Sequence, residues 1–322
     1  MSSVQAVVQA GGQPASRLME RLEERMATVA VSHGAALGRL ATEMLGAGGK
    51  RLRPLLVFVS AGIPPPESDG VLRAAVAVEL VHSATLVHDD VLDGSSLRRG
   101  RPTVFASAGR LAATATGDLL FSRAFAELAM AGSIAPVRVL ARASYELAAG
   151  ELMQRADAFT AVPVQRYLER CRLKTAVLFR AACELGAIEG GLGGDRVREL
   201  AEFGERIGLA FQLLDDVLDV SGPPERTGKP RGADLLDGTI TLPLILARER
   251  DPELTELDVQ EIRTADAAAT VCERIAATGA LEDSRLRALD MILTAKARLP
   301  ALAGRQRSAL ELVADGVVER YA

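Results

Sequence analysis

The chain contains no tryptophan and few other aromatic residues. Its 322 residues include eight Phe and three Tyr, although 48% of the residues are hydrophobic. Alanine and leucine supply most of the apolar side chains, and alternating runs of β-branched residues are scarce. Because alanine and leucine favour helices and the period-two alternation of strands is missing, the composition predicts an all-α fold. The length allows one large domain or two.

The net charge is small and cysteines are few, and both observations narrow the class of protein. The formal net charge of −4 gives no reason to expect nucleic acid as a partner. The three cysteines, Cys171, Cys183 and Cys272, are widely spaced and odd in number, so they predict a reduced compartment without a disulfide frame or zinc site. The opening residues MSSVQAVVQAGGQPAS lack the regions of a signal peptide. No uncharged apolar run reaches the ~20 residues of a membrane span. We therefore expect a cytoplasmic protein.

Helical patterns follow one another along most of the chain. Glycines and prolines mark the breaks at Gly46–Gly49, Ile63–Pro66, Gly190–Gly194 and Ser221–Gly232. No break has the length or composition of a linker, so we predict a single domain over residues 1–322, with residues 1–14 as a flexible arm. Helix bundles commonly place metal sites between facing helices. The predicted helices span residues 17–45, 51–61, 71–93, 101–115, 117–131, 135–158, 162–188, 194–220, 240–250, 254–277, 281–298 and 302–320.

The pentapeptide DDVLD occurs twice, at Asp89–Asp93 and at Asp215–Asp219, each time at the end of a long apolar stretch. On a helix, positions i, i+1 and i+4 lie close together, so each copy would present a cluster of carboxylates. Such clusters at the ends of buried helices are unstable unless cations lie among them. Mg²⁺ suits them because it takes a few carboxylates and leaves positions for phosphate oxygens. The predicted metal ligands are Asp89, Asp90, Asp93, Asp215, Asp216 and Asp219.

A single DDVLD is more often a solvated helix end than a metal site. The stretch from Val71 to Val87 before the first copy is apolar nearly all round, which indicates a buried helix rather than free surface. The second copy repeats the same arrangement. Together, the two copies indicate a metal-dependent enzyme whose substrate carries phosphate.

The segment GGKRLRP, at Gly48–Pro54, places Lys50, Arg51 and Arg53 where a helix should begin. Backbone N–H groups, a helix N-terminus and several cations together form an anion site. Taken alone, the segment also fits an ordinary basic helix start.

Three further basic elements follow along the chain. Arg98, Arg99 and Arg101 come directly after the first DDVLD, and guanidinium groups match phosphate oxygens bidentately. Lys174–Thr175 lies within an apolar helical stretch, where the lysine either extends to solvent or supports a buried anion. Thr227–Pro230 follows the second DDVLD.

Five segments, in this order, resemble the all-trans polyprenyl diphosphate synthases, the family of farnesyl, geranylgeranyl and longer-chain synthases. They are GGKRLRP, HDDVLDGSSLRRGRPT, LKTA, FQLLDDVLD and TGKPRGADLLDG. The resemblance covers about residues 45–245. It implies the isoprenoid synthase fold, a single-domain antiparallel helical bundle with a central metal-lined cavity, and a homodimer. It also implies a prenyltransferase that condenses isopentenyl diphosphate head-to-tail onto an allylic diphosphate, with Mg²⁺ at about three ions per site.

The resemblance also implies a role for each matching residue. Mg²⁺ would be held by Asp89, Asp93 and Asp215, while Asp216 and Asp219 act through metal-bound water or by positioning Lys229. Residues matching the allylic diphosphate site are Arg98, Lys174, Thr175, Gln212 and Lys229. Residues matching the isopentenyl diphosphate site are Lys50, Arg53, His82 and Arg99. The catalytic set is Asp89, Asp93, Arg98, Lys174, Asp215 and Lys229. Because no dedicated general base is visible, the released diphosphate would take the proton.

Product length depends on the side chains below the first aspartates. One helical turn rises ~5.4 Å, so successive turns before Asp89 measure the growing tail. Ala84 and Thr85, one turn before, are small, whereas short-chain relatives generally carry an aromatic there. This favours a long-chain product of the kind used for quinone side chains. Phe121 or Phe125 could form a deeper floor, which leaves a geranylgeranyl or farnesylgeranyl product open.

One residue departs from the family pattern, and three other functions remain open. Thr239 stands where many relatives have lysine, which removes a cation at the rim of the allylic site. A class I terpene cyclase would not need the second diphosphate pocket of Lys50, Arg53 and Arg99. A non-catalytic subunit of a heteromeric synthase typically lacks one or both aspartate motifs, and a helical scaffold would bind no diphosphate.

Overall fold

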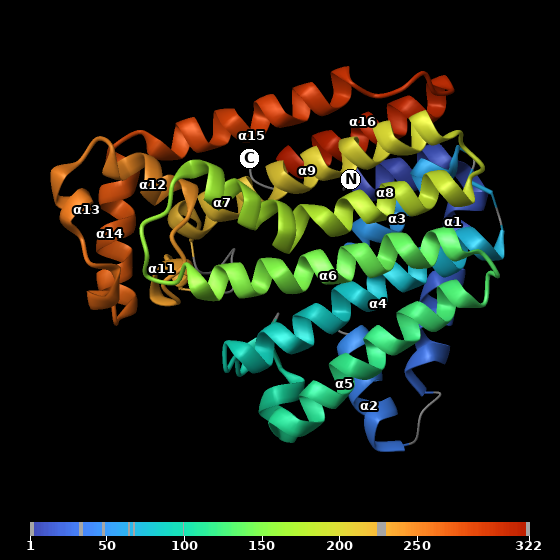
Figure 1. Ribbon diagram of the computed structural model, residues 1–322, viewed down its shortest axis with the longest axis horizontal. Coiled ribbons are helices and arrows are strands. Elements are labelled where there is room, and N and C mark those ends of the chain that lie inside the picture. The colour runs from blue at the N-terminus through green and yellow to red at the C-terminus, as the bar shows by residue number, and fades with distance from the viewer. Residues whose placement is uncertain are drawn as a thin grey trace. The chain divides into compact units, whose positions relative to one another are not determined.

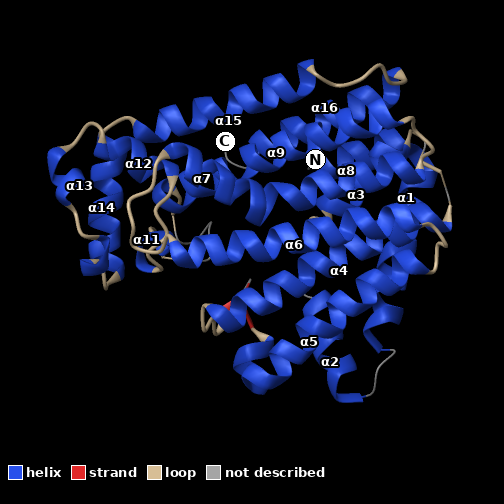
Figure 2. Ribbon diagram, viewed as in Figure 1, coloured by secondary structure: helices blue, strands red, loops and turns tan. Residues whose placement is uncertain are grey.

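The computed structural model describes residues 3–31, 35–46, 49–63, 65–66, 68–98, 100–223 and 230–319. Helices dominate these residues, and one two-stranded antiparallel pair is the only sheet within the described ranges (Figure 2). The predicted all-α class is therefore confirmed. The chain divides into two compact units, and several long helices contribute residues to both. A single domain over residues 1–322 stays a prediction.

The first unit comprises Met1–Ser144, Leu178–Gly204 and Leu299–Gly316. In it, α4 packs against α1, α3 and α5, as Figure 1 shows for the neighbouring α4 and α5. The unit contains α1 (Ser3–Val31), α2 (Ala35–Gly46), α3 (Leu52–Ala61), α4 (Asp69–Leu92), β1 (Leu97–Arg98), β2 (Arg101–Pro102), α5 (Val104–Ala129) and parts of α6 (Ile134–Ala156), α8 (Val177–Glu189), α9 (Gly194–Ser221) and α16 (Gly304–Glu319).

Helix α4 forms the centre of the first unit and carries the first DDVLD. Its N-cap is Ser68, whose side-chain oxygen accepts a hydrogen bond from the N–H of Val71 at 3.2 Å. The helix is long and apolar enough to cross a membrane, but 72% of its most apolar window is buried inside the protein. This burial is typical of a core helix. The burial explains why α4 is apolar on nearly all sides.

Two parts of the first unit differ from the sequence-based expectation. Residues 3–14, expected as a flexible arm, belong to α1, and Val7 in this segment is only 1% exposed. The helix breaks at Gly12, whose φ of 64° is unfavourable for other residues. Helix α5 spans the two helices expected over 101–131, and its break lies at Gly109 rather than near residue 116.

The second unit comprises Tyr145–Val177, Glu205–Arg298 and Val317–Ala322. Helix α12 packs against α7, α13, α14 and α15, and α11 packs against α14. Besides the remaining parts of α6, α8, α9 and α16, the unit contains α7 (Val164–Cys171), a π-helical turn (Arg172–Ala176), α11 (Ala233–Leu236), α12 (Leu242–Arg248), α13 (Pro252–Glu256), a 3₁₀ turn (Val259–Glu261), α14 (Ala265–Ala277) and α15 (Ala280–Ala297).

Arg51, in the GGKRLRP segment, joins several elements of the first unit. It is only 8% exposed, and its guanidinium donates to Glu23 of α1 at 2.7 Å, Glu79 of α4 at 2.8 Å and the carbonyl of Leu45 at 2.9 Å. Its backbone has φ 47° and ψ 36°, a left-handed conformation that is unfavourable for a residue with a side chain. The three acceptors hold the backbone in this conformation, directly between Lys50 and Arg53.

We expect the Arg51 network to contribute strongly to stability. Arg51→Met would leave the buried Glu79 carboxylate without its counter-charge and should lower the free energy of unfolding by about 3–5 kcal/mol. Chemical denaturation of the full chain measures this change. The control is Arg21→Met, which removes the exposed Arg21–Asp69 ion pair of 3.1 Å and should cost less than about 1 kcal/mol. Equal losses in the two variants would contradict the prediction.

Candidate active site

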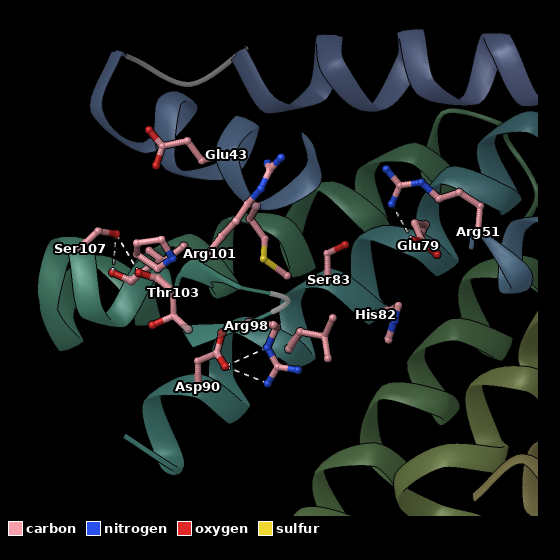
Figure 3. Close-up of a pocket in the computed structure, with 14 residues that line it drawn as sticks. Glu43, Arg51, Glu79, His82, Ser83, Asp90, Arg98, Arg101, Thr103 and Ser107 are labelled. Carbon is pink, nitrogen blue, oxygen red and sulfur yellow. Dashed lines mark hydrogen bonds and ion pairs between the residues drawn. The ribbon is translucent and has the colours of Figure 1, made fainter. Parts of the chain in front are cut away.

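The first DDVLD forms the last turn of α4, and its three aspartates differ in exposure. Asp90 is buried, with 2% of its surface exposed, whereas Asp89 is half-buried and Asp93, at the C-cap, is exposed. The Asp90 carboxylate accepts hydrogen bonds from the Nε of Arg98 at 2.9 Å and from its Nη2 at 2.8 Å (Figure 3). Asp90 therefore holds Arg98, and Asp89 and Asp93 are the more accessible carboxylates.

A short hairpin follows this motif and brings Arg98 back over the end of α4. Strand β1 pairs with β2, and the N–H of Ser95 donates to the carbonyl of Asp90 at 3.0 Å. The Thr103 hydroxyl donates to the carbonyl of Ser95 at 2.6 Å and accepts from the N–H of Ala106 at 3.0 Å, so it also caps α5. Arg99, predicted to bind isopentenyl diphosphate, lies outside the described residues.

A pocket of about 320 Å³ lies beside the hairpin in the first unit. Figure 3 shows His82 and Arg98 at this pocket, together with the Arg51–Glu79 pair. It is lined by Glu43, Met44, Arg51, Glu79, His82, Ser83, Leu86, Asp90, Arg98, Arg101, Pro102, Thr103, Val104 and Ser107. The structure thus brings together the predicted substrate residues His82 and Arg98.

Arg51 and Arg101 also line this pocket, whereas Lys50 and Arg53 do not. Lys50 is exposed, just before α3. Arg53 lies in α3, with the central carbon of its guanidinium 4.5 Å from the ring centroid of Phe179 in α8. Such a cation–π contact holds the guanidinium in place while keeping its charge.

The second DDVLD repeats the exposure pattern of the first. Asp216 is 3% exposed, whereas Asp215 and Asp219 are half-buried. One Asp216 oxygen accepts from the Tyr167 hydroxyl at 2.6 Å, and the other accepts from the Gln212 amide at 2.7 Å. Burial and the nearby Asp234 raise the pKa of Asp216, while the hydrogen bonds from Tyr167 and Gln212 act against that rise. The second aspartate of each motif is therefore buried and bound by hydrogen bonds from other side chains of the protein.

Lys174 and Thr175 lie in the π-helical turn, a distortion often found at functional sites. The Lys174 ammonium lies 2.6 Å from the Glu151 carboxylate. Burial acts to raise the pKa of Glu151, but Lys174 and Arg155 lower it below its usual value. At Gly150 in α6, an added Cβ would lie 2.7 Å from the backbone nitrogen of Lys174, so α6 approaches the turn closely only because this residue is glycine. Lys229, the remaining predicted cation, lies outside the described residues.

The residues predicted to set product length are not equivalent. Ala84 is fully buried, whereas Thr85 is half-buried and lies one turn before Asp89 on the same face of α4. Phe121 stacks on His88 with ring centroids 5.8 Å apart. It therefore lies close to the aspartate end of α4, which fits a rim better than a floor. Phe125, one turn further along α5, stays the candidate for a deeper floor.

The carboxylates fit the way Mg²⁺ is usually bound. Within the described ranges, no three acidic, His or Cys side chains converge to form a closed metal cage. Each DDVLD instead presents two carboxylates that are at least partly accessible. Mg²⁺ commonly takes one or two carboxylates and completes its shell with water and substrate phosphate. Asp89, Asp93, Asp215 and Asp219 fit this binding mode better than the internally held Asp90 and Asp216.

Comparison with known proteins shows the family. A family model for polyprenyl synthetase matches residues 35–277. A geranylgeranyl diphosphate synthase of Methanosarcina mazei is 36% identical over 290 residues, which cover 86% of this chain and 87% of the relative. This chain belongs to the polyprenyl synthetase family.

Other relatives support the same membership. Heptaprenyl diphosphate synthase component 2 of Geobacillus stearothermophilus is 42% identical to this polyprenyl synthetase over 227 residues, 70% of this chain and 71% of the relative. The crystal structure of a polyprenyl synthase from Caulobacter crescentus, complexed with calcium and isoprenyl diphosphate, is 36% identical. It has a TM-score of 0.90 and covers 100% of this chain and 99% of that chain. The predicted isoprenoid synthase fold and prenyltransferase class are confirmed.

The sequence did not predict the partners of two residues that hold the motifs of this polyprenyl synthetase. Arg51 stands in the sequence as one of three cations at the start of a helix, but it binds Glu23 and Glu79. Tyr167 carried no signal in the sequence, although its hydroxyl binds Asp216. A tyrosine at the predicted start of an apolar helix usually indicates only packing, so its polar partner becomes visible only in the fold.

We expect Asp90 to anchor the hairpin of this polyprenyl synthetase. Asp90→Asn keeps the shape of the side chain but removes the charge that Arg98 binds, so the hairpin should open more often. Amide hydrogen exchange over residues 95–103 should accelerate by about tenfold, the change expected for ~1.4 kcal/mol. Asp93→Asn, on an exposed residue of the same motif, is the matched control. Unchanged exchange in Asp90→Asn would show that the backbone hydrogen bonds suffice.

Proposed function

We propose that this prenyltransferase condenses isopentenyl diphosphate head-to-tail onto an allylic diphosphate to make a long-chain trans-polyprenyl diphosphate. The observation that carries the proposal is the repeated exposure pattern of the two DDVLD motifs. In each motif the second aspartate is buried and bonded, and the first and fifth are accessible. This is the arrangement expected of carboxylates that bind Mg²⁺ carried by a phosphorylated substrate.

In this reaction, the described residues would bind the diphosphates or stabilise the negative charge on them. Bound Mg²⁺ supplies positive charge that favours departure of the allylic diphosphate. Lys174 and Arg98, both already partnered with carboxylates at 2.6 and 2.8 Å, are held in place before substrate arrives. Such preorganised cations stabilise a leaving group without reorganisation. His82, Lys50 and Arg53 are proposed to hold the isopentenyl diphosphate, together with Arg99. Diphosphate released in the first step would take the proton lost in the second.

The names of the relatives bear on product length and on assembly. They include heptaprenyl and solanesyl diphosphate synthases, and also geranylgeranyl and geranylfarnesyl diphosphate synthases. Small side chains at Ala84 and Thr85 favour the longer products. Two relatives are named component 2 of a heptaprenyl diphosphate synthase, so a second polypeptide has to be tested as well.

A cytoplasmic homodimer is also proposed. Large apolar side chains are exposed along α5 and at the start of α6, where Leu111 is 85%, Met130 71% and Ile134 70% exposed. Exposed apolar side chains of this size are common at interfaces between subunits. Light scattering on the purified chain would give its mass in solution and decide between a monomer and a dimer.

The proposed function predicts metal-dependent chain elongation. The purified chain, with Mg²⁺, labelled isopentenyl diphosphate and geranyl, farnesyl or geranylgeranyl diphosphate, should form long trans-prenyl products, and a chelator should abolish turnover. Asp89→Asn should lower kcat by at least about a hundredfold. Products are extracted and sized. If diphosphates bind but none of the primers is elongated, the chain acts as the non-catalytic partner in a heteromeric enzyme.

We expect Thr85→Phe to shorten the product. An aromatic ring on the half-exposed face one turn before Asp89 would block a tail that runs along α4. Thr85→Val, which keeps the size of the side chain, should leave the product length unchanged. Ala84→Phe should also shorten the product, but Ala84 is 0% exposed, so this variant should lose about 1–3 kcal/mol of stability through overpacking. Long products from Thr85→Phe would mean that the tail follows another path.

A further inference from the structure

Three hydrogen bonds connect α7, the π-helical turn and α9 within the second unit. The Tyr167 hydroxyl lies 2.6 Å from one Asp216 oxygen, and the Gln212 amide nitrogen lies 2.7 Å from the other. The Gln212 amide oxygen lies 2.7 Å from the Thr175 hydroxyl. Tyr167 is 0% exposed and Asp216 is 3% exposed. These three hydrogen bonds, called the relay below, therefore run from the protein interior to Thr175, a predicted ligand of the allylic diphosphate.

The direction of each hydrogen bond in the relay follows from the donors available. Both oxygens of the Asp216 carboxylate accept, so the Tyr167 hydroxyl and the Gln212 N–H must donate to it. With its nitrogen turned to Asp216, the Gln212 amide turns its oxygen to Thr175. That oxygen only accepts, so the Thr175 hydroxyl donates its single hydrogen to Gln212.

The direction of these hydrogen bonds decides which groups can still donate a hydrogen bond to a diphosphate. A diphosphate oxygen needs a donor, and the hydrogen of the Thr175 hydroxyl is already given to Gln212. The Gln212 amide carries a second N–H beyond the one that Asp216 accepts. If the Gln212 amide were reversed, the Thr175 hydroxyl would be released and the amide nitrogen would face it instead. The orientation of one buried carboxylate thus sets the donors of two predicted ligands.

We propose that Tyr167 is a positioning residue for the allylic diphosphate site and acts through Asp216. Its hydroxyl fixes the Asp216 carboxylate, and this carboxylate fixes the orientation of the Gln212 amide and of the Thr175 hydroxyl. Tyr167 itself touches no substrate. The inference rests on the proposed function, because it assigns a role within the same site.

Position along α9 supports the same role. Gln212 and Asp216 are one turn apart on one stripe of the helix, and Asp215 and Asp219 are one turn apart on the adjacent stripe. Tyr167 and Thr175 both bind the first stripe. Holding that stripe fixes the rotation of α9 about its axis, and thereby the direction in which Asp215 and Asp219 point.

The test is Tyr167→Phe in the full chain, which removes one oxygen and leaves the buried ring. Initial rates are measured with Mg²⁺ while each substrate is varied at a saturating level of the other. We expect the KM for the allylic diphosphate to rise about tenfold, the effect of one hydrogen bond to a charged group, and the KM for isopentenyl diphosphate to stay within about twofold. The control is Tyr145→Phe, which removes the same oxygen from a tyrosine that is 75% exposed.

A double-mutant cycle separates positioning from packing. In a Gln212→Leu background the relay is already cut, so Tyr167→Phe should have little further effect on the KM for the allylic diphosphate. If Tyr167→Phe proves unfolded by circular dichroism, Asp216→Asn tests the same relay, because the new asparagine amide would turn a donor towards Gln212. This variant should also raise the KM for the allylic diphosphate and leave the KM for isopentenyl diphosphate nearly unchanged.

The outcomes distinguish this inference from the proposed function. Turnover by the wild-type chain with unchanged kinetics in Tyr167→Phe would overturn the role of Tyr167 and leave the prenyltransferase intact. Equal rises in both KM values, or an equal effect with and without Gln212, would show that Tyr167 acts only through the core. Absence of turnover in the wild-type chain would count against the proposed function itself.

Discussion

A carboxylate can be buried only where hydrogen-bond donors replace the water it loses, and each DDVLD motif contains one such carboxylate. Asp90 takes its donors from Arg98, and Asp216 takes them from Tyr167 and Gln212. These bonds determine where the hairpin lies after α4 and how α7 and the π-helical turn pack on α9. The accessible aspartates of both motifs depend on them. In each motif the buried aspartate thus supports the structure, and the proposed metal binding belongs to the more accessible aspartates.

The helical placement of both acidic motifs could be predicted from the sequence, because residue type and helical spacing were sufficient. The roles of Lys50, Arg98 and Lys174 in binding diphosphate stay predictions. The resemblance assigned different roles to the aspartates, but the burial of Asp90 and Asp216 was not visible, since identical letters in DDVLD give no exposure. Asp90 and Asp216 are buried because of partners that come from outside the motif.

Local details of the fold also could not be predicted from the sequence. The hairpin at Leu97–Pro102 has four strand residues, too few for a periodic pattern. Residues 3–14 lacked a clear helical period because Gly12 breaks α1, although Val7 and Ala15 are buried. Arg51 resembled a substrate cation because only the fold brings Glu23 and Glu79 to it. In each case, contacts between distant segments outweighed local preference.

The π-helical turn at Arg172–Ala176 holds one residue more than a regular helical turn would. An extra residue rotates all later residues of the helix by about 100° around the helix axis. Lys174 and Thr175 therefore sit at the point where the phase changes, while Phe179 and the rest of α8 follow the new phase. Deleting one residue here would restore an unbroken α-helix and give a locally more regular backbone. The same deletion would rotate the lysine and threonine away from Glu151 and Gln212. In this segment, regularity of the helix and placement of the site cannot be optimised together.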